Sequence, residues 1–158
     1  MIISTRKGDR GETSLGDGTI VHKDNLIISL IGILDECQAN VGTARAVSGG
    51  RIYENILYIE RDLGLLMGHV SRSKGSECPP IEPLEEIIAE AESKTEKLTF
   101  LLPGESQFSA ALHVARTVAR RAERLGTALF RNEQIGSDVL RYLNRLSDYF
   151  YALIILSK

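Results

Sequence analysis

Four arginines fall within nine residues, in a segment whose apolar residues repeat with a helical period. Arg116, Arg120 and Arg124 are spaced four residues apart, so in a helix they form one row of like charges. Such neighbours repel each other by roughly a few tenths of a kcal/mol per pair. Because a guanidinium group matches the oxygens of phosphate and carboxylate, the row indicates a bound polyanion or acidic protein partners. A solvated or interhelical charged face is the alternative interpretation.

The segment 1–22 combines glycines with basic and hydroxyl side chains. In chain order it contains Lys7, Gly8, Arg10, Gly11, Thr13 and Ser14. Glycines let backbone N–H groups approach an anion, hydroxyls donate hydrogen bonds, and cationic side chains neutralise charge. The segment has no GxxxxGK[ST] motif and is therefore not a Walker A loop. We predict an ordered glycine-rich arm without strands, which is either a phosphate loop or a solvated tail.

Polar residues also interrupt the apolar pattern near the C-terminus. Asn144 and Asp148 are four residues apart and share one face of a predicted helix. A buried polar pair needs partners, so the two residues predict an interhelical hydrogen bond or recognition of a purine or ribose edge by Asn144. Asp35 follows another apolar run and could pair with an arginine. None of the three histidines has a Glu three residues before it, which excludes a ferritin-like di-iron site.

The composition restricts the class of protein. The chain has 158 residues, of which 43% are hydrophobic and 25% charged, as is typical of one globular domain. Its net charge of −2 and 6% aromatic content argue against a nucleic-acid binder. Two cysteines without a CxxC pair, and no signal peptide, predict a reducing, cytoplasmic location. No apolar run reaches the roughly 18–20 residues that span a bilayer, so we expect no membrane association.

Helical periodicity then predicts the elements that position these residues. We expect helices over about 24–48, 51–72, 83–97, 107–130 and 137–157. Pro83 suits a first helical turn, and Ser106 and Ser137 are candidate N-caps. No strand alternation of useful length is present. The prediction is a single all-α domain over 1–158: a five-helix bundle over 24–157 preceded by the glycine-rich arm 1–22.

Three blocks of the sequence resemble the PduO-type ATP:cob(I)alamin adenosyltransferases, the corrinoid adenosyltransferases. The first block is Thr5–Ser14 followed by Lys23, the second runs from Phe100 to Arg124, and the third is Tyr142–Asp148. The second and third, in this order and spacing, carry the specificity. The likeness extends over about residues 3–156. Cys37 and Gln38 stand where the family commonly has Leu with Asn or Ser, near the presumed corrin side.

The resemblance implies a homotrimer with active sites at subunit interfaces. It implies transfer of the 5′-deoxyadenosyl group from ATP to the cobalt of cob(I)alamin, which gives adenosylcobalamin and triphosphate. Mg²⁺ would be bound through ATP, with no protein side chain assigned to it. A reductase and an adenosylcobalamin-dependent enzyme are implied as partners, whereas nucleic acid and membrane are not. A non-catalytic ATP-binding or corrinoid-delivery module and a purely structural oligomer are the alternative functions.

Position by position, the resemblance also implies roles for individual residues. Catalytic roles go to Arg120 at the triphosphate and to Phe100 beneath the corrin ring. A salt bridge between Asp35 and Arg116 would cross the subunit interface. The implied ATP-binding residues are Thr5, Arg6, Lys7, Gly8, Thr13, Ser14, Lys23, Arg120, Arg121, Glu123, Arg124 and Asn144.

Overall fold

Five helices and a short hairpin make up the computed structural model, which describes residues 6, 8–95 and 101–158 of the chain. The predicted all-α bundle of five helices is confirmed. The third helix ends earlier than predicted. The elements are β1 (Glu12–Ser14), β2 (Ile20–His22), α1 (Leu26–Ala46), α2 (Gly50–Val70), α3 (Glu82–Ser93), α4 (Gln107–Arg131) and α5 (Ser137–Leu156).

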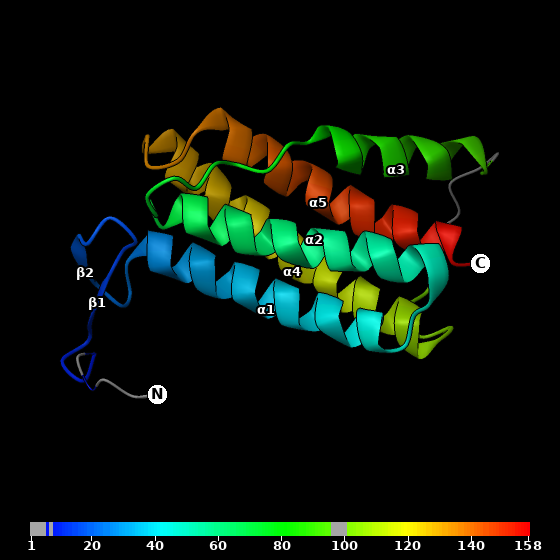
Figure 1. Cartoon of the computed structure of the whole chain (residues 1–158), viewed down its shortest axis with the longest axis horizontal. Coiled ribbons are helices and arrows are strands. Elements are labelled where there is room, and N and C mark those ends of the chain that lie inside the picture. The colour runs from blue at the N-terminus through cyan, green and yellow to red at the C-terminus, as the bar shows by residue number, and fades with distance from the viewer. Residues whose placement is uncertain (1–5, 7, 96–100) are drawn as a thin grey trace.

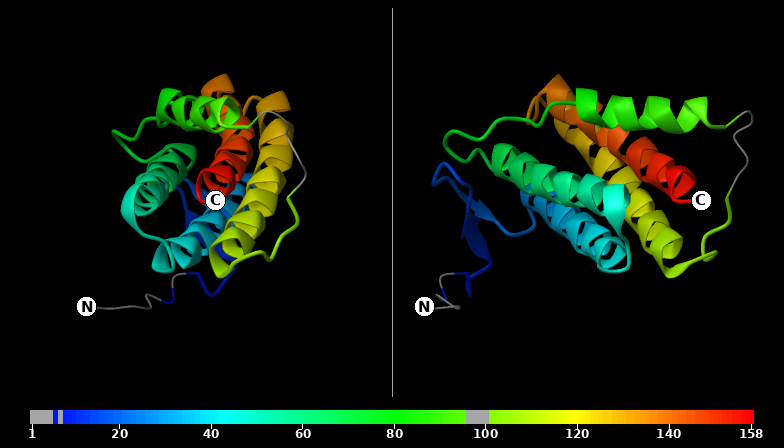
Figure 2. Two further views of the ribbon diagram at one scale, coloured as in Figure 1. Left: turned by 90° about the vertical axis from the view of Figure 1, so that its right-hand side faces the viewer. Right: turned by 45° about the vertical axis from the view of Figure 1, so that its right-hand side comes forward.

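The helices run side by side, with the hairpin at the end where α1 begins and α2 finishes (Figure 1). α1 packs against α4 and α2, while α5 packs against α4, α3 and α2. Viewed along the bundle, α5 lies in the middle of the other helices (Figure 2). Consistent with this, α5 buries Tyr142, Tyr149 and Phe150 almost completely. The apolar C-terminal stretch is therefore packed core.

The helix starts follow capping chemistry. The Ser106 hydroxyl accepts a hydrogen bond from the Ser109 backbone N–H, and the Ser109 hydroxyl accepts one from the Ser106 N–H. This reciprocal pair stabilises the start of α4, as predicted. The prediction for α5 was wrong, because Gly136 is the N-cap and Ser137 is the first helical residue. A Cβ at position 136 would lie 2.3 Å from Asp138 Oδ1, so only glycine fits beside this carboxylate without a shift.

α1 differs from the expectation that no segment could span a membrane. By length and composition alone, Leu26–Ala46 is long and apolar enough to do so. In the structure Leu30, Leu34 and Val41 of this helix are completely buried, while 28% of its most apolar window as a whole is buried. A single helix of this kind is weak evidence for a membrane span. Its outer side is also apolar, because Ile31 and Ile33 are only partly buried.

The N-terminal arm forms two strands that the sequence analysis did not predict. β1 and β2 pair antiparallel, with Thr13 opposite Val21. Each strand has three residues, which is too short for apolar alternation to be visible in the sequence. Asp17 Oδ1 accepts from the Thr19 backbone N–H at 2.9 Å, and Gly18 has a φ of 87° in the connecting turn. A positive φ of this size favours glycine.

One carboxylate is buried inside the bundle. Asp62 of α2 is 4% exposed, and its Oδ2 accepts a hydrogen bond from the Tyr142 hydroxyl of α5 at 2.9 Å. Burial raises the pKa of Asp62, while hydrogen bonds from Tyr142 and Tyr58 act in the opposite direction. The two tyrosines thus replace part of the solvation that the carboxylate loses on folding.

Tyr142→Phe should therefore destabilise the protein by about 1–3 kcal/mol at pH 7, the cost of leaving a buried acceptor with fewer donors. The loss should be smaller near pH 4. Because the folded-state pKa of Asp62 lies above its unfolded value, its ionisation removes stability as pH rises, and losing a donor strengthens this effect. Urea unfolding at both pH values measures it.

Tyr149→Phe is the matched control, since the Tyr149 hydroxyl donates to a neutral acceptor, the backbone carbonyl of Asn55, at 2.9 Å. Its cost should vary less with pH. An equal loss at both pH values for Tyr142→Phe would show that the Asp62 contact does not carry the effect.

Candidate functional site

α4 has one packed face and one cationic face. Ala115, Ala119 and Ala122 are completely buried. Arg116 is half-buried on the other side, and Arg120, Arg121 and Arg124 are exposed. The two-faced helix expected from the sequence is therefore confirmed, and the row of arginines does exist.

The four guanidinium groups have different surroundings. Arg121 forms an ion pair with Glu36 of α1. Arg116 Nε is buried and has no hydrogen-bond partner among the residues that the structure describes. Within the described part of the chain, Arg120 and Arg124 form no ion pair. The Glu36 carboxylate thus neutralises Arg121, which lies next to the row, while Arg120 and Arg124 stay available to an anionic ligand.

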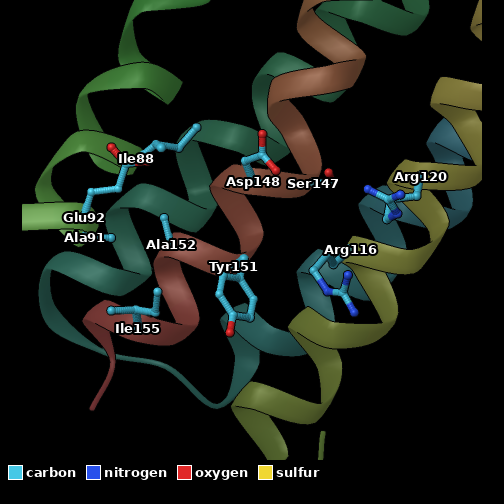
Figure 3. A pocket seen from close by; sticks show the side chains of 10 residues that line it. All are labelled: Ile88, Ala91, Glu92, Arg116, Arg120, Ser147, Asp148, Tyr151, Ala152 and Ile155. Atoms are coloured by element: carbon cyan, nitrogen blue, oxygen red, sulfur yellow. The ribbon is translucent and has the colours of Figure 1, made fainter. Parts of the chain in front are cut away.

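Arg116 and Arg120 line a cavity of about 380 Å³ between α3, α4 and α5 (Figure 3). Ser147, Asp148 and Tyr151 of α5 lie across from them. Partial desolvation raises the pKa of the Asp148 carboxyl, although the residue is exposed, and the charges of Arg145 and Arg120 partly offset this rise. The remaining lining is mostly apolar and consists of Ile88, Ala91, Glu92, Ala152 and Ile155. The cavity can hold an anionic group at its α4 wall and an apolar group at its α3 wall.

Asn144 pairs across helices. Its amide Nδ2 donates to Glu123 Oε1 at 2.9 Å, which confirms the predicted interhelical hydrogen bond. Asn144 and Asp148 are exposed rather than buried, so neither is required to complete the core. The Asn144–Glu123 pair offers a hydrogen-bond donor and acceptors beside the arginine row.

The arm forms a second cavity, of about 660 Å³, against the start of α1 and the end of α2. Its lining includes Thr13, Ser14 and Lys23, which were predicted to act together. Gly8 also belongs to this group, because a Cβ there would lie 2.7 Å from Lys23 Nζ. Arg6 is exposed, with a φ of 55°. Ser71 completes the lining, and no sequence signal linked it to the arm.

The two cavities share no lining residue. Of the predicted ATP-binding residues, Arg120 lines the first cavity, whereas Thr13, Ser14 and Lys23 line the second. The predicted partners Asp35 and Arg116 are not paired within the chain either: Asp35 is exposed, and its neighbour Glu36 pairs with Arg121 instead. Thr5, Lys7 and Phe100 lie outside the described residues.

Cys37 and His113 are both buried beside the site. The Cys37 thiol donates to the Ala115 carbonyl at 3.6 Å, and burial raises its pKa to about 12. It therefore stays a neutral thiol that packs α1 against α4. His113 has no hydrogen-bond partner on either ring nitrogen in the described structure, and burial lowers its pKa. Both residues are accordingly structural and uncharged at pH 7.

Among the described residues, no group of three or more His, Cys, Asp or Glu side chains could hold a metal ion. We assign no metal ligand among these side chains.

The fold and the site define a helical-bundle protein with an arginine-lined cavity and a separate glycine-rich arm. The chain belongs to the cobalamin adenosyltransferase family, whose model matches residues 3–157. It is 36% identical to a corrinoid adenosyltransferase from Bacillus subtilis, over 96% of this chain and 84% of that protein. It is also 36% identical to a cobalamin adenosyltransferase from Cupriavidus metallidurans, over 96% of this chain and 85% of that protein.

Solved structures of this family have the same fold as this chain. A PduO-type ATP:corrinoid adenosyltransferase from Lactobacillus reuteri, a point variant complexed with cobalamin and ATP, matches with a TM-score of 0.86. The two chains are 32% identical, and the match covers 96% of this chain and 90% of that chain. A further variant of the same enzyme, complexed with ATP, matches equally well over 98% of this chain and 93% of that chain.

The docking of the arm yields a test. Gly16 N–H donates to the Ser71 carbonyl at 2.7 Å, and a Cβ at position 16 would lie 2.6 Å from Ser73 Cα. Gly16→Ala should weaken docking by about 1–3 kcal/mol, as overpacking usually does. We expect faster hydrogen exchange at the hairpin amides and unchanged exchange in the bundle helices.

Gly49→Ala is the matched control, because no atom lies within 4 Å of a Cβ there. Exchange at the hairpin that stays at the wild-type rate in Gly16→Ala would contradict the contact.

Proposed function

We propose that this protein transfers the 5′-deoxyadenosyl group of ATP to the cobalt of cob(I)alamin, giving adenosylcobalamin and triphosphate. Family membership supports this reaction, as do the solved relatives complexed with cobalamin and ATP. The observation in this chain that carries it is the pair Arg120 and Arg124, which form no ion pair within the described residues and lie on α4 three residues before and one residue after Glu123, the hydrogen-bond partner of Asn144. A polyphosphate would neutralise the charge of these arginines, while the nucleoside would form hydrogen bonds with the Asn144 amide.

The reaction needs no protein nucleophile. Co(I) supplies an electron pair to C5′ of ATP, a cobalt–carbon bond forms, and the bond between C5′ and the triphosphate oxygen breaks. The electron pair of the broken bond leaves with triphosphate, and cobalt becomes formally Co(III). The protein then has to orient C5′ toward cobalt and stabilise negative charge on the leaving group. The neutral, buried Cys37 and His113 are not required for either task.

Each charged residue has a task in this scheme. Arg120 and Arg124 bind the triphosphate, and Lys23 with the Thr13 and Ser14 hydroxyls binds it from the arm. Glu123 and Asn144 face the nucleoside, since a carboxylate repels phosphate but accepts from ribose hydroxyls. Arg121, with its partner Glu36, fixes the neighbouring arginines. The remaining arm residues, Thr5, Arg6, Lys7 and Gly8, enclose the nucleotide.

A homotrimer with sites between subunits is the assembly that these features support. The arm cavity and the arginine cavity are separate within one chain, so the arm of one subunit would close over the arginines of the next. Among the described residues Arg116 forms no ion pair, and Asp35 is exposed, so both side chains are available for a salt bridge between subunits. The apolar outer side of α1 would be covered by the neighbour.

Cobalamin would lie against the apolar part of this interface, with Phe100 beneath the corrin ring to keep water and the lower axial base from cobalt. A one-electron reductase would supply Co(I), and an adenosylcobalamin-dependent enzyme would receive the product. Mg²⁺ would come with ATP. We place the reaction in the cytoplasm.

Arg120→Ala should lower kcat by about 10²–10³-fold, the usual loss when one charge-stabilising donor is removed. Formation of adenosylcobalamin from ATP, Mg²⁺ and chemically reduced cobalamin, under strict anoxia, gives the rate. Arg131→Ala removes an exposed arginine from the last turn of the same helix and should keep wild-type turnover. Normal turnover in Arg120→Ala would contradict the triphosphate role, and no product from the wild-type protein would contradict the proposed reaction.

Asp35→Asn should lower turnover about tenfold or more, because leaving one member of a buried charge pair alone costs about 2–5 kcal/mol. The double variant Asp35→Arg with Arg116→Asp restores opposite charges across the interface and should recover part of the lost trimer stability. Sedimentation measures the assembly and the cobalamin assay measures turnover. A trimer and a rate that are both unchanged in Asp35→Asn would rule out the intersubunit pair.

A further inference from the structure

A chain of three hydrogen bonds connects α3, α5 and α4 beside the arginine row. Arg145 Nε donates to Glu85 Oε1 at 3.0 Å, and Arg145 Nη1 donates to Asn144 Oδ1 at 2.8 Å. Asn144 Nδ2 then donates to Glu123 Oε1 at 2.9 Å. Glu85 lies on α3, Arg145 and Asn144 on α5, and Glu123 on α4. Glu85 and Glu123, at the two ends of this series of hydrogen bonds, therefore lie on two helices that both pack against α5.

The chemistry of the partners fixes which way the Asn144 amide points. A guanidinium group can only donate hydrogen bonds, and a carboxylate can only accept them. The amide oxygen must therefore face Arg145, and the amide nitrogen must face Glu123. One Nδ2 hydrogen and one Oδ1 lone pair remain for a ligand, in a known direction. Without Arg145, the amide would lose the contact that holds its oxygen.

We propose that Arg145 is a positioning residue for nucleotide recognition: it orients the Asn144 amide toward the nucleoside of ATP, and Glu85 of α3 holds Arg145 in place. The inference rests on the proposed function, in which Asn144 and Glu123 meet the nucleoside. Arg145 itself acts through Asn144. Arg145 is adjacent to Asn144 in the sequence, but its partner Glu85 lies 60 residues away, and no sequence pattern predicts their contact.

The exposure of the pair separates this role from a purely structural one. The Arg145 and Glu85 side chains are 40% and 45% exposed, and such surface ion pairs contribute little to stability. Removing Arg145 should therefore leave unfolding nearly unchanged while it alters ligand binding. The charge of Arg145 also reaches Asp148, whose pKa it lowers, so a test must separate charge from geometry.

Calorimetric titration of the full-length protein with ATP and with inorganic triphosphate, both with Mg²⁺ and without cobalamin, separates the two effects. A change in net charge weakens both ligands alike and cancels in the ratio of their dissociation constants. In Arg145→Gln the preference for ATP over triphosphate should fall about three- to tenfold, the loss expected for one hydrogen bond. Glu85→Gln should lower it by less.

Arg51→Gln is the matched control. Arg51 of α2 pairs with Glu90, which lies on α3 as Glu85 does. Because Arg51 does not contact Asn144, the preference for ATP over triphosphate should stay at the wild-type value. In an Asn144→Ala background, Arg145→Gln should cause no further loss of preference, because its effect passes through the amide. Urea unfolding of Arg145→Gln should match the wild type.

An unchanged preference in Arg145→Gln, or an equal further loss in the Asn144→Ala background, would overturn the positioning role while ATP binding by the wild type still supports the proposed function. Failure of the wild-type protein to bind ATP would overturn both.

Discussion

The close approach of α4 to its neighbours is the constraint on which the site depends. Ala115, Ala119 and Ala122 have no exposed surface, and a Cβ at Gly126 would lie 2.6 Å from Leu143 Cδ1 of α5. Small residues thus let α4 pack tightly against α1 and α5. Every larger, charged residue of the segment must then lie on the other side of α4. The arginine row is the consequence of this division, and its position relative to Asn144 and Asp148 follows from the α4–α5 contact.

The four arginines are tolerated together because their surroundings differ. Arg121 is neutralised by Glu36, whereas the buried Nε of Arg116 has no hydrogen-bond partner among the described residues. Arg120 and Arg124 are exposed and keep their solvation without a ligand. The charge pattern thus separates a structural ion pair at Arg121 from two exposed arginines that are available to a polyanion.

Much of this arrangement could be predicted from the sequence. The helical period located all five helices, and the Ser106 N-cap marked the start of α4 within one residue. The hairpin was missed because strands of three residues leave no period to read. The α5 cap was misassigned because Ser137 has the side chain of a good cap, but the extended backbone falls one residue earlier, at Gly136. The sequence correctly indicated that a helix begins here, but it placed the N-cap one residue too late.

The site was predicted in parts rather than as a whole. Glu123 and Asn144 were expected to act together, and their hydrogen bond confirms the contact between α4 and α5. Ser71 and Glu85 were not found, since only the fold brings the end of α2 to the arm and α3 to Arg145. Such contacts join residues far apart in the sequence, and no spacing rule reports them.

The separation of the two cavities in one chain has a physical reason. The arm is held at the end of the bundle by its contact with the end of α2, where Gly16 meets Ser71 and Ser73. Arg120 lies near the middle of α4, about three helical turns from either end of that helix. The arm hydroxyls and the α4 arginines therefore line different cavities of one chain. In the homotrimer that we propose, the arm of one subunit and the arginines of another would bind the same nucleotide, so that assembly would complete the site.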